Sequence, residues 1–209
     1  KYLDNLLSGT LLEGLQISGN SKINLMMKEK TSHLNVDLKN VALTLAENNF
    51  NKLNAQLFWL DRELTYPNKN NMEETFSVRE SHFSWEEVSY KKLKIGKTAF
   101  SFQAQNNKIK VDKKIKVPVF DGTFIVKNLY LENIFNDLEI SFDGVLEPVS
   151  MSLISEQLDW PRLHGKLSAL IPHTSYTQKQ LNLGGKLWFN LFDGQFSLDE
   201  ISVYHPLTD

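Results

Sequence analysis

The sequence contains no cysteine among its 209 residues. Disulfides, thiolate metal sites and cysteine nucleophiles are therefore excluded together. It also lacks any run near the roughly 18 to 20 consecutive apolar residues that a membrane-spanning helix needs. Positive charge is not in excess, since the net charge is −2 and the pI is near 6.2. Because binding to a phosphate backbone depends on lysine and arginine, we expect no nucleic-acid partner.

Catalytic motifs are missing as well. The sequence has no Gly-x-Ser-x-Gly elbow, no glycine-rich phosphate loop and no dinucleotide-binding fingerprint. Its five histidines show no spacing that would bring two ligands to one metal ion; they are His33, His82, His164, His173 and His205. We therefore predict a protein that is not an enzyme and that carries no metal and no cofactor.

An alternation of apolar and polar residues dominates the sequence. A period of two is typical of strands that bury one face. With 41% hydrophobic residues, the chain can also bury a substantial core. We predict a mainly β fold and a single β-rich segment over residues 1–209. The alternation is clearest at 15–17, 23–25, 36–38, 41–45, 53–60, 100–102, 109–119 and 163–171.

Helical spacing is rare. Leu3, Leu6 and Leu7 have it before a glycine, and a second short helix is predicted over residues 150–158, between two prolines. The asparagine-rich stretch 66–74 predicts a loop. The chain starts at Lys1 rather than Met and stops directly after a strand-like run, so we expect a segment of a larger protein.

The tripeptide Phe-Asp-Gly occurs three times, at 120–122, 142–144 and 192–194. Chance placement at this composition gives about 0.03 occurrences, so the tripeptide marks an internal repeat. Two copies extend further, because residues 119–131 match residues 191–203 at an offset of 72. We place the repeat units around 115–131 and 187–203. In each copy, aspartate before glycine is interpreted as turn chemistry rather than as a calcium or catalytic site.

Asp-Gly between two alternating runs predicts a hairpin with a two-residue turn, in which both central residues have positive φ. Closing the turn at 121–122 pairs Val119 with Phe124, and Val117 with Val126. The turn at 193–194 likewise pairs residue 191 with 196, and 189 with 198. Each copy then changes parity, after 126 and after 198, which predicts a bulge. We predict an elongated, twisted and curved antiparallel sheet of repeated hairpins with one or two short helices.

Two further sets of residues have both a structural and a functional interpretation. Lysines alternate with apolar residues and form a stripe that favours a solvent-facing or guarded edge strand and that also fits anionic headgroups; they are Lys108, Lys110, Lys114 and Lys116. The four tryptophans fit a buried core or platforms for a stacked ligand; they are Trp59, Trp85, Trp160 and Trp188.

Residues 115–207 resemble the AsmA-like periplasmic proteins, in particular their YdbH-like branch. The resemblance is carried by Phe-Asp-Gly-Thr-Phe at 120–124, the run Phe-Asp-Gly-Val-Leu-Glu-Pro-Val-Ser-Met at 142–151, and Leu-Asp-Trp-Pro-Arg-Leu-His-Gly-Lys-Leu at 158–167. Ile-Pro at 171–172 and Phe-Asp-Gly-Gln-Phe at 192–196 complete it. Residues 1–114 share only the alternating β character, and the family supplies no catalytic residue to carry over.

The resemblance implies a bacterial envelope protein of the periplasm, anchored in the inner membrane in its full-length form. It also implies a hydrophobic β-groove that binds or conducts phospholipid between the inner and outer membranes, with other envelope proteins as partners. The apolar faces of the two hairpins would line this groove; they comprise Ile115, Val117, Val119, Phe124, Val126, Phe189, Leu191, Phe196 and Leu198.

Alternation alone does not separate an open groove from a closed core. Two other functions therefore stay open at this point. One is an envelope scaffold or interaction module that pairs through its edge strands. The other is a carbohydrate-binding β-sandwich that uses aromatic side chains as stacking platforms.

Overall fold

The computed structural model describes residues 16–28, 31–45, 48–62, 79–90, 93–134, 137–177, 180–192, 194–199 and 202–204. Most of them lie in strands, as the alternation predicts. The strands are β1 (Gln16–Lys28), β2 (Thr31–Leu45), β3 (Asn48–Arg62), β4 (Ser81–Trp85), β5 (Glu87–Tyr90), β6 (Leu93–Ile95), β7 (Thr98–Gln105), β8 (Lys108–Lys110), β9 (Ile115–Val119), β10 (Gly122–Glu132), β11 (Glu139–Ser150), β12 (Lys166–Thr177), β13 (Gln180–Leu183), β14 (Leu187–Leu191), β15 (Gly194–Leu198) and β16 (Ser202–Tyr204).

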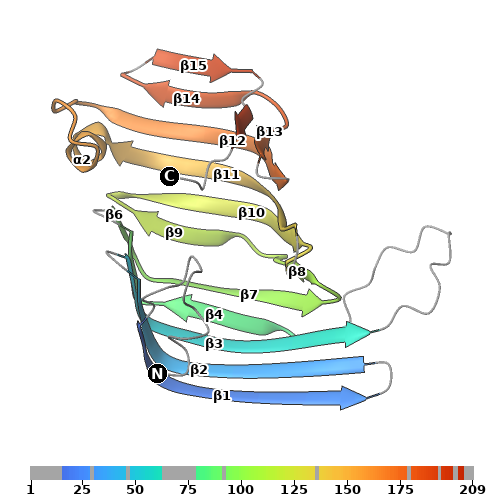
Figure 1. Cartoon of the computed structure of the whole chain (residues 1–209). Helices are drawn as coiled ribbons and strands as arrows, with labels where there is room; N and C mark the ends of the chain where they lie inside the picture. Colours follow the sequence, from blue (N-terminus) through green and yellow to red (C-terminus); the bar gives the residue numbers. More distant parts are fainter. Residues whose placement is uncertain are drawn as a thin grey trace, which may run out of the picture.

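These strands form one curved sheet that runs from β1 at one edge to β15 at the other (Figure 1). Neighbouring strands are antiparallel except for a two-residue parallel pairing between β3 and β7. The predicted fold class is therefore confirmed. The predicted helix over 150–158 is also present, as α2 (Met151–Gln157). The helix expected around Leu3 to Leu7 and the loop at 66–74 lie outside the described residues.

The middle of the sheet closes on itself. Starting from β3, successive pairings pass through β4, β7, β8, β10, β9, β6 and β5 and return to β3. The link between β6 and β9 is short, with Ile95 opposite Val119 and the Gly96 N–H donating to the Pro118 carbonyl at 2.9 Å. We call these eight strands the central ring. Strands β1 and β2 form the N-terminal wing, and β11, β12, β14 and β15 form the C-terminal wing.

The main hydrophobic core lies inside the central ring. Its buried members are Phe102, Ala104, Val111 and Ile115. Half-buried apolar residues from β3, β4, β7, β9 and β10 pack around them, with Phe83 and Phe100 in aromatic contact at 5.6 Å. Burial of this cluster holds the ring closed, because apolar surface removed from water stabilises by about 25 cal/mol per Å².

A line of irregular residues crosses the first three strands and bends them. Gly19 on β1, Asn40 on β2 and Lys52 on β3 all have positive φ, and the register between β1 and β2 shifts at Gly19. A Cβ at Gly19 would lie 2.7 Å from the Asn40 carbonyl oxygen, so the strands approach too closely there for any other residue. Aligned bulges of this kind turn a sheet sharply, and here they lead the strands toward β5.

Both predicted hairpins form, but their turns lie one residue earlier than expected. Val119 pairs with Gly122 rather than with Phe124, and Phe124 pairs with Val117. The loop is therefore 120–121, and positive φ falls on Phe120 rather than on Asp121 and Gly122. In the second hairpin, residue 191 pairs with 194 and 189 with 196, and Phe192 has positive φ. The predicted pairings were thus wrong by two residues.

Tertiary contacts explain the displaced turn. The Asp121 carboxylate accepts hydrogen bonds from the Ser150 backbone N–H, at 2.7 Å, and from its hydroxyl. Ser150 is the residue that precedes α2, so this contact joins the first hairpin to the start of the helix. Gly122 lies in β10, where a Cβ would come within 2.6 Å of the Val149 side chain and 2.8 Å of the Pro148 oxygen.

The Phe-Asp-Gly copy at 142–144 is not a turn. This corrects the interpretation of all three copies as turns. Residues 142–144 lie inside β11, beside a register shift in β12. The Asp143 carboxylate accepts a hydrogen bond from the Asn128 side-chain amide at 2.5 Å. Asn128 has positive φ and lies where β10 changes register against β11, so the bulge predicted after Val126 is confirmed. The corresponding position after Leu198 lies partly outside the described residues.

Gly122→Ala is expected to destabilise the fold by about 1–3 kcal/mol, because the new Cβ forces β11 away from the hairpin. Thermal unfolding followed by circular dichroism measures the effect. Gly185→Ala is the matched control, since its Cβ would meet only Pro172 at an ordinary 3.4 Å. Equal melting temperatures for the two variants would contradict the close packing at Gly122.

Asp121→Asn is expected to lower stability by about 0.5 kcal/mol at neutral pH, a small value because the carboxylate is exposed. Hydrogen bonds from Ser150 lower the pKa of Asp121 below its ordinary 3.8. A carboxyl group whose pKa is lower in the folded state stabilises the fold above that ordinary value, and this contribution is lost as the pH falls below it.

Melting temperatures across a pH series measure this difference. The gap between the native protein and Asp121→Asn should close in acid. A gap for Asp121→Asn that does not vary with pH would show that charge at Asp121 contributes nothing.

Candidate functional site

The candidate site is the inner face of the sheet, which we define as the face whose side chains form the core of the central ring. Directly opposed residues on neighbouring strands point to the same face, so the registers trace this face from strand to strand. On this face, two rows of side chains run across the strands from the ring toward the wings.

The long row contains one apolar or aromatic residue from each of nine neighbouring strands. It starts on β1 and ends on β13, and each residue is directly opposed to the next. Its nine side chains span about 38 Å at the usual spacing of strands. The members are Leu25, Leu34, Trp59, Ala104, Ile109, Leu131, Ile140, Tyr176 and Leu181.

The short row crosses the C-terminal wing on the same face. It connects the core of the ring to the β15 edge and is apolar throughout. Its members are Val117, Phe124, Leu146, Ala169, Phe189 and Phe196. Gly144 leaves room in this row for the Phe124 ring, because a Cβ at Gly144 would lie only 3.0 Å from that ring. At the far end Phe189 and Phe196 stack with centroids 5.3 Å apart.

Exposure along the inner face changes from the ring to the wings. Ile115 in the ring is 4% exposed, whereas Phe196 on β15 is 47% exposed and Met27 on β1 is 73% exposed. No second layer of described residues covers the wings, since the single described helix lies beside β11 at the end of the strands (Figure 1). Apolar surface of this extent on an open sheet is typical of a binding face.

The nine predicted groove residues all share this inner face, because a slip of two residues leaves every side chain on its original side. The structure nevertheless divides them. Ile115 belongs to the buried core of the ring, and Val117 and Val126 pack against that core. Val119 and Phe124 lie on the ring strands β9 and β10. The remaining four lie on the open C-terminal wing; they are Phe189, Leu191, Phe196 and Leu198.

The N-terminal wing contributes inner-face residues that the sequence analysis did not select. Ile23, Leu25 and Met27 alternate along β1 and are all strongly exposed. Their alternation was visible in the sequence and predicted a strand. It could not assign them to the same face as the hairpins, because that assignment depends on the pairing of β3 with β7 and of β8 with β10.

The lysine stripe lies on the opposite face of the sheet. Lys108 forms an ion pair with Glu132 at 3.2 Å, and Lys110 forms one with Asp112 at 2.9 Å. Lys116 is exposed and lies between inner-face residues of β9, while Lys114 is exposed just before that strand. These lysines therefore do not border the apolar rows of the inner face.

The charged groups whose pKa is shifted lie at the surface of the protein. Besides Asp121, the pKa of Glu86 is lowered, chiefly by its hydrogen bond with Lys97 at 2.8 Å. Among the described residues, no group of three or more histidine, aspartate or glutamate side chains is placed to hold a metal ion.

No family model, no curated protein and no solved structure matches the chain. Within the part of the chain that the structure describes, no helix has the length and apolar character needed to cross a membrane.

Proposed function

We propose that this chain is a non-enzymatic segment of a periplasmic, inner-membrane-anchored envelope protein whose inner face binds phospholipid acyl chains and conducts them between the inner and outer membranes. The observation that carries the proposal is the apolar inner face, whose long row spans about 38 Å, is buried in the core of the ring at its middle and is exposed at Leu25 on β1. The resemblance of residues 115–207 to AsmA-like proteins supports the envelope setting and the lipid.

Acyl chains suit such a face energetically. Each buried CH₂ contributes about 0.8 kcal/mol, so a 16-carbon chain gains on the order of 12 kcal/mol before its costs. One leaflet of a bilayer is about 15 Å thick in its hydrocarbon part, so the long row exceeds the length of one acyl chain. The middle of the long row is buried in the core of the ring, so a bound chain contacts the exposed apolar residues of the wings, along which it can shift with little change in free energy.

Native mass spectrometry of the purified chain, followed by organic extraction, tests the proposal. We expect phospholipid to co-purify at a defined ratio to protein. A mass equal to that of the bare chain, unchanged after incubation with phosphatidylethanolamine vesicles, would contradict it.

Phe196→Glu is expected to reduce co-purified phospholipid at least tenfold, because it places a charge at the exposed end of the short row. Phe124→Glu should act in the same way further along the row. The fold should survive Phe196→Glu, since the side chain is half exposed, and circular dichroism checks this.

Ser197→Glu is the matched control, because Ser197 is the next residue on β15 and points to the opposite face. It should retain lipid at the native level. Equal retention by Phe196→Glu and Ser197→Glu would place the lipid elsewhere, and unfolding of Phe196→Glu would identify its side chain as closed core.

A second candidate function is an envelope scaffold that pairs through its edge strands. The observation that favours it is β1, whose 13 residues are all exposed and which pairs only with β2 among the described strands. A strand edge of this length offers unpaired backbone groups to another chain. Partner binding that is lost on Asn24→Pro, in a chain that holds no lipid, would favour this function instead.

A further inference from the structure

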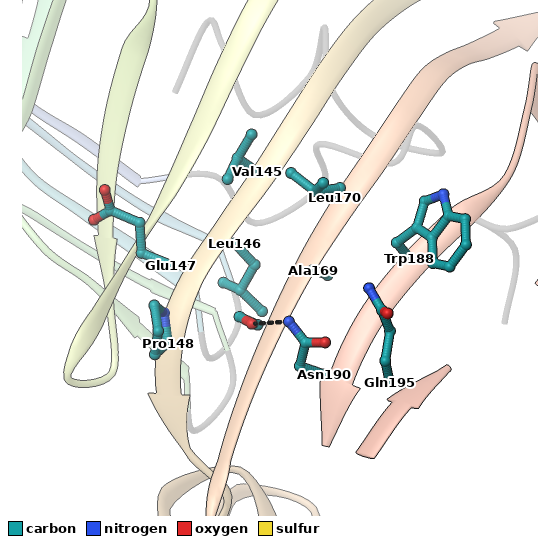
Figure 2. A pocket seen from close by; sticks show the side chains of 10 residues that line it. Val145, Leu146, Glu147, Pro148, Ala169, Leu170, Trp188, Asn190 and Gln195 are labelled. Atoms are coloured by element: carbon teal, nitrogen blue, oxygen red, sulfur yellow. Dashed lines mark hydrogen bonds between the residues drawn. The ribbon is translucent and has the colours of Figure 1, made fainter. Parts of the chain in front are cut away.

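The outer face of the C-terminal wing carries a depression of about 550 Å³ (Figure 2). Its volume lies in the range of about 300–1,000 Å³ that is typical of sites for small ligands. Residues of β11, β12, β14 and β15 line it. Most of them alternate with the members of the short row along each strand and therefore point to the outer face, while Leu146 and Ala169 of the short row also border the depression.

One side of the depression is apolar. Val145, Leu170 and Trp188 are directly opposed on three neighbouring strands and form a continuous strip. Leu170 is 57% exposed and Trp188 is 40% exposed, so the strip is open to solvent. The Lys186 ammonium lies 5.3 Å from the Trp188 ring centroid and also forms an ion pair with Asp199 at 3.4 Å. These contacts hold the indole in position.

The other side of the depression is polar and uncharged except for one carboxylate. Ser168, Asn190 and Gln195 are directly opposed on β12, β14 and β15, one step along the strands from the apolar strip (Figure 2). The Asn190 amide donates to the Ser168 hydroxyl at 3.3 Å. The side chains of Gln195 and Glu147 form no hydrogen bond or ion pair with any described side chain, so the Gln195 amide and the Glu147 carboxylate can both bind a ligand.

We propose that this depression binds a β-1,4-linked oligosaccharide, with a sugar ring stacked along the strip of Leu170 and Trp188. A pyranose with equatorial substituents has a flat face of C–H groups and a rim of hydroxyls. The flat face matches the apolar strip, and the hydroxyls match the amides of Asn190 and Gln195 and the carboxylate of Glu147. An acyl chain would leave these polar groups without partners, which disfavours a lipid here.

The four tryptophans differ in ways that make this proposal testable. Trp59 and Trp85 lie on the inner face, where Trp59 packs against the core and Trp85 donates its indole N–H to the Gly96 carbonyl. Trp160, which follows α2, is 56% exposed but does not line the depression. It therefore serves as a control for an exposed tryptophan outside the proposed site.

Isothermal titration of the purified chain with cellohexaose and with chitohexaose tests the proposal. We expect saturable binding of at least one of them, weakened at least tenfold by Trp188→Ala and less by Trp188→Phe, which keeps an aromatic platform. Trp160→Ala should bind as the native protein does. Gln195→Ala should weaken binding about threefold, since one hydrogen bond is lost. Circular dichroism checks that each variant is folded.

Three results would overturn the proposal: no heat with either sugar at millimolar concentration, binding that Trp188→Ala leaves unchanged, or self-association of the chain that Trp188→Ala abolishes. The last would identify the depression as a contact between copies. The lipid assay is independent, because Trp188→Ala leaves the inner face intact. Loss of sugar binding with normal lipid content therefore separates the two sites.

Discussion

The burial of Phe102, Ala104, Val111 and Ile115 inside the central ring is the constraint on which the rest of the structure depends. An open, curved sheet has no second layer to cover its apolar face. Here the sheet covers that face only in its middle, by turning back through β5 and β6 to meet β9. The same closure leaves apolar side chains of both wings without a second layer among the described residues, so the buried core and the exposed apolar face have one origin.

Much of the fold was predictable from alternation, because a period of two specifies a strand and the face it buries. The side of each groove residue was correct even though the turns were displaced, since the error was two residues. The displacement itself was not predictable. It arises because Asp121 binds Ser150 and Gly122 packs against Val149, contacts between segments about 27 or more residues apart that no local rule contains.

The extent of the candidate site was less predictable than its chemistry. The hairpin residues were identified from their own repeat, but the β1 residues join the same face only through pairings made by β7 and β8. The depression at Trp188 was equally hidden, because it combines residues from four strands. The sequence marks the four tryptophans alike, and only strand order separates the two on the inner face from Trp188 on the outer one.

Among the described strands, β1 and β15 each pair with a single neighbour, which gives the sheet the behaviour of a one-dimensional assembly. Each wing strand is stabilised mainly by its immediate neighbours, whereas the ring strands are held from several directions. Local opening should therefore cost little free energy at the edges and progressively more toward the ring. The edge strands of such a sheet can open locally to accommodate a bulky ligand, while the strands of the central ring keep their register.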